Sequence, residues 1–477
     1  MDYSITESKA TEQIGEDNSF FEALRDREYP LLDQQDHLYL DYTGGNLCPR
    51  SLLDTHFTML REHILGNPHS TNPTSLKSTE LIEETKAAII EFFNAQDYHC
   101  VFTANASGAL KILGESYPFD SESTFILLSD NHNSVNGIRE FCKNKGGRTQ
   151  YVKLQVEDLQ LDRNNLIELI DGVTAGANNL FAFPAQSNVT GMQHDLSWIE
   201  YAQSKGLDVL LDAAAFVPTS RLDLEKYKPD YVCVSFYKMF GYPTGIGCLL
   251  VKKTKFNKLR KPWFAGGTVS YVSVVSPIEV LSEGAERYED GTLNYEMIPA
   301  IKLGLDYINE IGIDRINRRV KHLIKYLHDE LLKLKHENGL PLVRIFGTED
   351  FSAHGGNIIL NFFDAEGKMI PYTLIESRAN EQLISLRTGC FCNPGIDEIN
   401  NCITNNEMND YFSSRRNASY RDIMDFLGKM RGALRLLSAA NIMIRRLKSI
   451  LQLVIPAKVI PFSAVIPHIQ PAAPIEK

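Results

Sequence analysis

The stretch Ser235-Phe236-Tyr237-Lys238-Met239-Phe240-Gly241-Tyr242-Pro243-Thr244-Gly245-Ile246-Gly247 decides how the rest of this chain is interpreted. It lies between two apolar runs, 231–234 and 247–251, which predict buried strands. Lys238 therefore comes just after the end of a strand, and this is the edge at which open α/β sheets bind ligands. A lysine held there among apolar neighbours can lose its proton and attack a carbonyl. A solvated loop lysine is the alternative, and the residues at the ends of the other strands decide between the two.

Length, charge and cysteine content set the broad class of protein. The 477 residues are enough for two or three domains. A net charge of −11, from 49 basic and 60 acidic residues, argues against non-specific binding of nucleic acid or of an anionic membrane. No secretory signal and no apolar stretch of membrane-spanning length is visible, and the eight cysteines lack the density of a disulfide scaffold. We therefore expect a cytoplasmic enzyme with reduced thiols that acts on a small molecule, with no nucleic-acid or membrane partner.

From residue 100 onward, short apolar strands alternate with segments of helical length. The clearest strands are 100–103, 125–128, 179–183 and 209–211. Together with the two strands beside Lys238 they predict an α/β fold, in which a mostly parallel central sheet carries helices on both faces. The second half begins with one long helical pattern and continues with strands at 342–345 and 357–362, which predict a smaller C-terminal α+β domain.

The predicted domain organisation has four parts. They are an N-terminal arm (1–38), a large domain (39–300), a small domain (301–455) and an extended proline-rich tail (456–477).

Residues suited to binding a cofactor lie at the ends of four of the predicted strands. Ala106 and Ser107 open a helix whose free N–H groups suit a phosphate. His132 can stack on an aromatic ring, and the Asn188 amide can bond a ligand hydroxyl. Asp212 ends an apolar strand, where a buried carboxylate implies a cationic group beside it. An acid and a lysine at later strand ends are what a pyridinium cofactor requires, because the acid keeps the ring nitrogen protonated while the lysine forms the Schiff base.

Three segments carry a family resemblance: 212–219, 235–245 and Leu386-Arg387-Thr388-Gly389-Cys390-Phe391-Cys392-Asn393-Pro394-Gly395. They resemble the class V aminotransferases, which are fold-type I enzymes that use pyridoxal 5'-phosphate (PLP) and include the cysteine desulfurases. Within that family they are most similar to the desulfurase-like N-terminal part of molybdenum cofactor sulfurases. The resemblance covers roughly residues 38 to 455. It implies a fold-type I PLP-dependent transferase and a homodimer.

The resemblance also implies roles in binding the cofactor. Lys238 would carry PLP covalently, Asp212 would pair with its ring nitrogen, His132 would stack on the ring, and Asn188 would bond its phenolic oxygen. The phosphate would be held by Ala106, Ser107, Ser235 and Tyr237, and by Thr268 of the neighbouring subunit.

Substrate binding is assigned in the same way. Arg435 would clamp the substrate α-carboxylate with its planar fork, with Arg387 in the loop beside the cysteines. Residues 288–292 would line the entrance to the site.

The Cys390-Phe391-Cys392 segment has two interpretations from its residues alone. Two cysteines supply half of a tetrahedral zinc site, and no well-spaced second pair is present, so we expect no metal. The positive charge of Arg387 favours the thiolate form of a nearby cysteine, and the thiolate is the nucleophilic form. The resemblance implies that Cys392 takes sulfur from L-cysteine as a persulfide, with release of alanine. The sulfur would pass to an acceptor protein or to the molybdenum cofactor, and Cys390 remains the alternative nucleophile.

Two positions depart from the family pattern. Ala215 stands where many class V enzymes have Gln or His, and Asp397 stands where sulfurases often have a further cysteine for sulfur relay. Too few residues remain after Arg435 for the second, molybdenum-cofactor-binding domain, which we expect to be missing. An aminotransferase, epimerase or lyase acting on another amino acid therefore stays open. A scaffold protein is disfavoured by the intact pair of Lys238 and Asp212.

Overall fold

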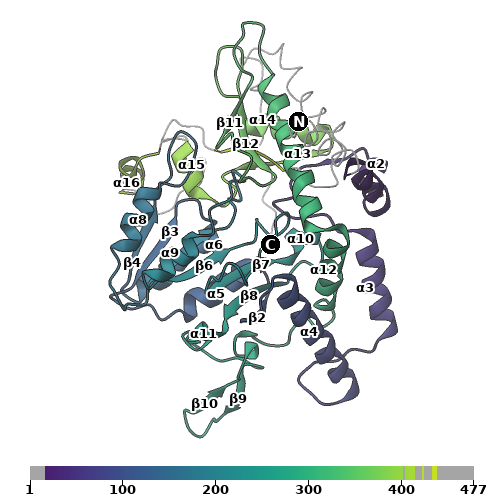
Figure 1. Cartoon of the computed structure of the whole chain (residues 1–477), viewed down its shortest axis with the longest axis vertical. Helices are drawn as coiled ribbons and strands as arrows, with labels where there is room; N and C mark the ends of the chain where they lie inside the picture. Colours follow the sequence, from purple (N-terminus) through teal and green to yellow (C-terminus); the bar gives the residue numbers. More distant parts are fainter. Residues whose placement is uncertain (1–16, 401–402, 414–421, 424–431, 438–477) are drawn as a thin grey trace, which may run out of the picture.

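A seven-stranded sheet forms the centre of the computed structural model, which describes residues 17–400, 403–413, 422–423 and 432–437 (Figure 1). The strand order is β2-β8-β7-β6-β5-β3-β4, and β8 alone runs against the other six. The predicted mostly parallel sheet is thus confirmed. Its strands are β2 (Tyr98–Thr103), β3 (Thr124–Leu128), β4 (Arg148–Val152), β5 (Leu180–Pro184), β6 (Asp208–Asp212), β7 (Tyr231–Ser235) and β8 (Gly247–Lys252).

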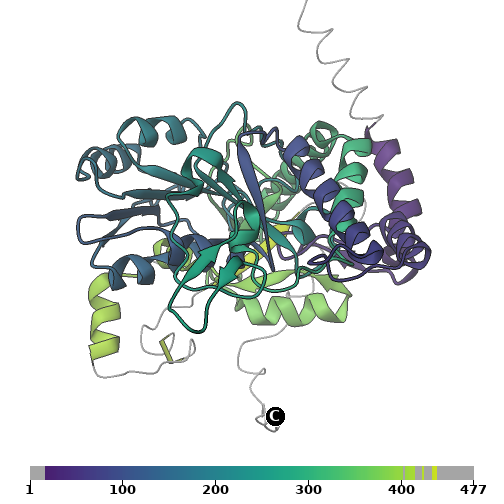
Figure 2. The ribbon, with the colours of Figure 1, turned by 90° about the horizontal axis from the view of Figure 1, so that it is seen from below.

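Helices cover both faces of this sheet, as Figure 2 shows from below. On β7, Val232 and Val234 belong to one buried cluster while Tyr231 and Cys233 belong to the other, because successive side chains of a strand alternate between faces. The first cluster is covered by α4 (Pro73–Phe92), α8 (Arg163–Asp171), α9 (Trp198–Ser204) and α12 (Pro299–Ile311); the second by α5 (Ala106–Ser116) and α7 (Ile138–Asn144). Edge strand β4 escaped prediction because most of its side chains are polar and exposed.

The smaller domain is built on an antiparallel sheet in the order β11-β12-β15-β14. The predicted long helix is two helices, because Gly312 adopts φ 88° and breaks the helical path between them. Leu38, Leu40 and Tyr42 pack into the core of this domain, where β1 pairs in parallel with β13. Its elements are α13 (Ile313–Leu332), β11 (Val343–Phe346), β12 (Asn357–Phe362), α14 (Tyr372–Glu381), β13 (Ile384–Ser385), β14 (Arg387–Gly389) and β15 (Ala433–Leu437), with β1 at Leu38–Tyr39.

Residues 17–28 are also helical. The other described helices are α2 (Pro30–Gln34), α3 (Arg50–Glu62), α6 (Asn133–Asn136), α10 (Phe236–Phe240), α11 (Lys253–Phe256), η1 (Ala285–Tyr288), α15 (Pro394–Asn400) and α16 (Asn405–Ser413). The described helices include none with the length and apolar character needed to cross a membrane. The first 16 residues of the predicted arm and the predicted proline-rich tail lie outside the described residues.

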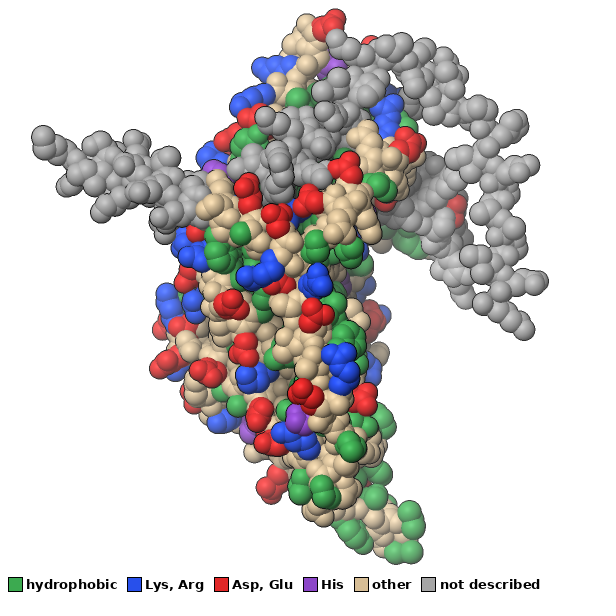
Figure 3. Space-filling model, turned by 90° about the vertical axis from the view of Figure 1, so that its right-hand side faces the viewer, with side chains coloured by type: hydrophobic (Ala, Val, Ile, Leu, Met, Phe, Trp, Pro, Cys, Tyr) green, Lys and Arg blue, Asp and Glu red, His purple; other side chains and the backbone are tan. Residues whose placement is uncertain are grey.

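One hairpin projects from the body of the molecule (Figure 1). It consists of β9 (Val269–Val272) and β10 (Glu279–Leu281), which pair antiparallel. At its tip Val274 is 100% exposed and Val275 91% exposed. Figure 3 shows hydrophobic side chains gathered at this lower end. A soluble monomer rarely leaves such side chains clustered in water, so this tip is a candidate contact surface.

Candidate active site

Lys238 lies on α10, a helix of little more than one turn that continues from β7 without a loop. Gly241 ends this helix with φ 78°, and a Cβ there would lie 2.4 Å from the carbonyl carbon of Leu47, so only glycine fits. Among the described residues, no hydrogen bond or ion pair engages the Lys238 amine. Burial lowers the pKa of this amine below the ordinary lysine value, and the charge of Asp212 opposes that effect.

One pocket at the carboxyl edge of the sheet collects eight of the nine residues predicted to bind the cofactor. They lie at or just beyond the ends of five different strands, β2, β3, β5, β6 and β7. This is the edge at which open α/β sheets bind ligands. The eight are Ala106, Ser107, His132, Asn188, Asp212, Ser235, Tyr237 and Lys238.

The first turn of α5 lines the pocket together with the hydroxyl groups of Ser107, Ser134 and Ser235. Asn105 caps this helix by accepting a hydrogen bond from the Gly108 N–H (3.0 Å). The Ala106 N–H donates to Ser235 Oγ (2.8 Å), and Ser107 Oγ lies 2.6 Å from Ser134 Oγ. Helix N–H groups together with hydroxyls form a donor set that suits a phosphate.

A fixed carboxylate and a neutral ring also line the pocket. Asp212 Oδ1 accepts hydrogen bonds from the Ala214 N–H (3.0 Å) and from the Cys233 thiol (3.3 Å). Burial lowers the pKa of His132, so its ring is neutral near pH 7. Its Nδ1 accepts the Ser134 N–H (3.1 Å), which leaves the ring proton on Nε2.

The cysteine loop, residues 390–393, is docked on the rim of this pocket. The Asn133 N–H donates to the Cys392 carbonyl (2.7 Å), and Asn188 Nδ2 donates to the Phe391 carbonyl (2.9 Å). Phe391 and Cys392 both have φ 55°, a conformation that non-glycine residues adopt only when their surroundings enforce it. One N–H of the Asn188 amide is thus already committed to the loop. Its predicted bond to the cofactor's phenolic oxygen would have to use the other.

Both predicted substrate-binding arginines meet one carboxylate, Asp41, that no sequence motif had marked. Buried Arg435 donates from Nη1 to the Asn188 carbonyl (2.8 Å) and from Nη2 to Asp41 (3.1 Å). Arg387 donates from Nε (3.0 Å) and Nη2 (2.7 Å) to the same carboxylate. Burial lowers the pKa of Arg435 to about 10. The hydrogen bond between Arg387 and Asp41 raises the pKa of Arg387. Cys392 is close enough to raise the pKa of both guanidinium groups.

Thr268 lies outside the pocket of its own chain. It is buried, and its hydroxyl donates to the Ala265 carbonyl while accepting the Ala265 N–H, both at 2.9 Å. Its contact with a neighbouring subunit stays a prediction.

The prediction that residues 288–292 line the entrance is wrong for the first two of them. Tyr288 is buried and donates to the Leu259 carbonyl (3.0 Å), while Glu289 accepts the Phe102 N–H (2.8 Å). Both side chains therefore stabilise the large domain. Asp397, at the position of the sulfurases' further cysteine, is also buried and accepts the Gly432 N–H (2.8 Å), just before β15.

The pocket matches PLP part by part. The Lys238 amine suits its aldehyde, Asp212 its ring nitrogen, the neutral His132 ring its face, and the first turn of α5 its phosphate. The fold and this pocket together define a class V aminotransferase: residues 38–400 match the family Aminotransferase class-V, and the chain belongs to it. Enzymes of this family use PLP, so the pocket is a PLP site.

The chain is similar to proteins named molybdenum cofactor sulfurase. It is 34% identical to that of Solanum lycopersicum over 407 residues, which cover 78% of this chain and 49% of the relative. Identity to that of Homo sapiens is also 34%, over 82% of this chain and 46% of the relative. The chain thus spans about half the length of these relatives.

Solved structures show the same fold. The apo structure of a cysteine desulfurase from Thermococcus onnurineus NA1 superposes with a TM-score of 0.75 at 22% identity, covering 91% of this chain and 97% of that one. A cysteine desulfurase from Escherichia coli gives 0.71 at 20% identity, covering 91% and 97%.

Proposed function

We propose that this protein is a PLP-dependent cysteine desulfurase that takes sulfur from L-cysteine as a Cys392 persulfide and releases alanine. The observation that carries the proposal is the docked cysteine loop, which brings an exposed thiol to the rim of the PLP pocket and close to two arginines. The similarity to sulfurases and desulfurases supports the same reaction.

The electrostatics of the pocket suit this chemistry. Because burial lowers the pKa of Lys238, more of its amine is neutral near pH 7, where it can attach the cofactor and later accept the substrate Cα proton. Arg435, beside Arg387, is placed to bind the substrate carboxylate. The bound cofactor supplies an electron sink for the carbanion at Cα.

Cys392 performs the sulfur transfer. Its thiolate attacks the substrate sulfur, and an S–S bond forms as the Cβ–S bond of the substrate breaks. The electron pair of the broken bond stays with the carbon skeleton, which takes up a proton and leaves as alanine. In the overall balance one thiol and one cysteine give one persulfide and one alanine, with no external oxidant or reductant.

A direct assay tests the reaction. The PLP-loaded protein is incubated with L-cysteine and a thiol reductant, and alanine and sulfide are quantified. We expect both in equal amounts from the wild type and from Cys390→Ser, and neither above background from Cys392→Ser. Undiminished sulfide from Cys392→Ser would overturn the role of Cys392. Formation of 2-oxo acids or of the D-amino acid instead of alanine would indicate an aminotransferase or an epimerase.

We also propose the molybdenum cofactor as sulfur acceptor, which the similarity to named sulfurases supports. The test is transfer of ³⁵S from labelled L-cysteine to a molybdenum enzyme carrying the desulfo cofactor. Label that stays on Cys392 would indicate that a different acceptor protein is needed.

A homodimer is the third part of the proposal. The exposed valines at the tip of the β9–β10 hairpin support it, because burying apolar side chains against a second copy removes them from water. Thr268 immediately precedes β9, so a partner seated on this hairpin would also contact the segment that the family resemblance assigns to the neighbouring subunit.

A further inference from the structure

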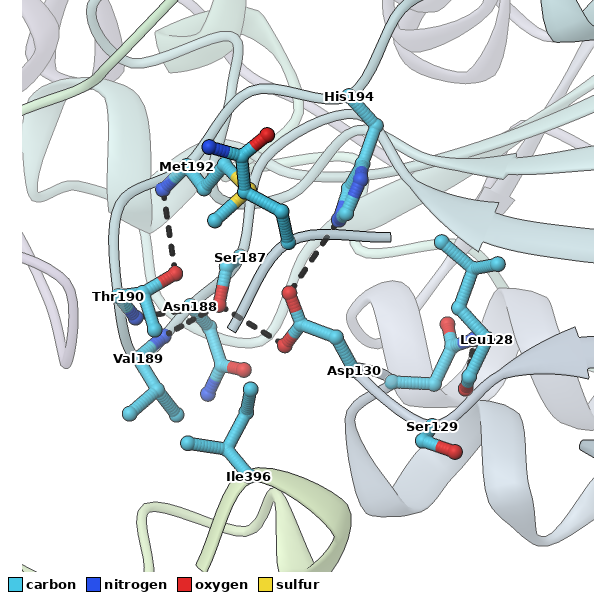
Figure 4. A network of polar contacts seen from close by, with 12 residues as sticks. Leu128, Ser129, Asp130, Ser187, Asn188, Val189, Thr190, Met192, His194 and Ile396 are labelled. Carbon is cyan, nitrogen blue, oxygen red and sulfur yellow. Dashed lines mark hydrogen bonds and ion pairs between the residues drawn. The ribbon is translucent and has the colours of Figure 1, made fainter. Parts of the chain in front are cut away.

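A buried polar cluster contacts the cysteine loop through Asn393. Figure 4 shows its members Asp130, Ser187 and His194. Its centre is Asp130, which is 1% exposed and lies just beyond β3, two residues before His132. Asp130 Oδ1 accepts hydrogen bonds from Ser187 Oγ (2.9 Å) and Asn393 Nδ2 (2.7 Å), while His194 Nε2 lies 3.2 Å from Oδ2. Neither the binding of the cofactor nor the proposed reaction uses this carboxylate.

Asn393 connects the cluster to the loop. It is fully buried, it comes immediately after Cys392, and its Nδ2 donates both to Asp130 and to Asn188 Oδ1 (3.1 Å). Asn188 in turn donates to the Phe391 carbonyl. The two residues before Asn393 are therefore held from both sides, which explains how Phe391 and Cys392 keep an unfavourable backbone conformation.

The backbone packing agrees with a docked loop. Gly395 lies so close to the end of β3 that a Cβ there would be 2.0 Å from the Ser129 carbonyl oxygen. Ser129 precedes Asp130, so the same short segment contacts the loop through its backbone and through a carboxylate. A buried carboxylate is costly unless its partners are in place, which makes the pairing with Asn393 sensitive to small changes.

We propose that Asp130, acting through Asn393, is the positioning residue that docks the cysteine loop and presents Cys392 at the cofactor pocket. The role of this docking in sulfur transfer rests on the proposed function, whereas the contacts that hold the loop do not. Asp130 is not among the residues that line the cofactor pocket, and its contact with the loop is made through Asn393.

A reciprocal exchange of the two side chains tests the pairing. In Asn393→Asp two carboxylates would face each other across the 2.7 Å contact, which should release the loop. In the double variant Asp130→Asn/Asn393→Asp, the new amide can donate to the new carboxylate and restore this contact, while the bond from residue 393 to Asn188 Oδ1 stays lost. Asp130→Asn alone keeps an acceptor for Ser187 and Asn393. Asn294→Asp, at an exposed position, controls for the added charge.

Hydrogen exchange measures whether the loop is docked and does not require enzyme activity. The Asn133 amide donates to the Cys392 carbonyl and the Asn393 amide donates to the Cys390 carbonyl (3.0 Å), so both report docking. At pH 8 in the PLP-loaded protein, we expect these amides to exchange at least about tenfold faster in Asn393→Asp. We expect rates near wild type in Asp130→Asn and Asn294→Asp, and a rate between those of wild type and Asn393→Asp in the double variant, which recovers one of the two lost contacts. Wild-type exchange in Asn393→Asp, or no recovery in the double variant, would overturn the proposal.

A second measurement separates the positioning role from the proposed function. Alanine release at saturating L-cysteine should fall about tenfold in Asn393→Asp, with the half-saturating concentration and the cofactor absorbance little changed, and should recover partly in the double variant. If the wild type releases no alanine, the proposed function fails, while the exchange data still decide whether Asp130 docks the loop. If Asn393→Asp does not fold, Asn393→Ala removes the contact without added charge and should also speed exchange.

Discussion

Substitution of one glycine should undock the cysteine loop without touching any polar contact. A Cβ at residue 395 would lie 2.0 Å from the Ser129 carbonyl oxygen and 2.8 Å from its carbonyl carbon, whereas real Cβ contacts are at least 3.0 Å. The backbone of α15 or of the β3 end must therefore move by about 1 Å. Overpacking against backbone costs up to about 3 kcal/mol, and alanine regains up to about 1 kcal/mol of helix propensity. We expect a net cost of about 2 kcal/mol for docking.

This cost corresponds to a shift of roughly 30-fold toward the undocked loop. In Gly395→Ala the amides of Asn133 and Asn393 should exchange faster by about that factor, measured by hydrogen exchange and mass spectrometry. Gly137→Ala is the matched control, because its Cβ would meet the nearest atom at 3.5 Å, an ordinary contact. Equal exchange in Gly395→Ala and wild type would refute the reasoning that the close approach of residue 395 and Ser129 holds the loop.

Three further predictions concern the pocket and the hairpin. Asp212→Asn removes a charge that raises the pKa of Lys238, so the pH at which the apoprotein attaches PLP, monitored by absorbance, should move lower; an upward shift would contradict this. Arg435→Lys replaces a planar two-donor fork by a single ammonium, and losing a charged hydrogen bond to the substrate carboxylate, worth about 1.5–3 kcal/mol, should raise KM for L-cysteine about 10- to 100-fold, whereas exposed Arg344→Lys should not. In the proposed homodimer, Val275→Asp should halve the mass measured by sedimentation, and an unchanged dimer would remove the hairpin from the interface.

Much of the sheet and pocket was predictable from local pattern. The buried strands are apolar runs, and parallel strands bring the residues after them to one edge, so Lys238, Asp212, His132 and Asn188 could be expected together. Edge strand β4 lacks that pattern because it is half exposed, and the break at Gly312 was invisible to helical periodicity, which continues across it.

The contacts that organise the site beyond the pocket could not be read from the sequence. Asp41 meets Arg435 from 394 positions away, and Asp130 meets Asn393 from 263 away. Such pairings depend on tertiary packing between segments far apart in the sequence, and neither aspartate lies in a distinctive local pattern. The one available signal was that Asp130 shares a strand end with His132. Tyr288 and Glu289 show the opposite error, in which a family motif suggested an entrance position for side chains that this chain buries in its large domain.

Asp41 gives the site an anion of its own where the substrate's anion is expected to bind. Arg435 and Arg387 share this carboxylate, which offsets the repulsion between two neighbouring cations. The two arginines are therefore already paired when an amino acid binds, and the substrate carboxylate must share them with Asp41 or replace it. Binding becomes an exchange of ion pairs, so the net free energy that the arginines contribute is smaller than that of the new ion pair alone. Such an arrangement favours release of alanine, which carries the same carboxylate as the substrate it came from.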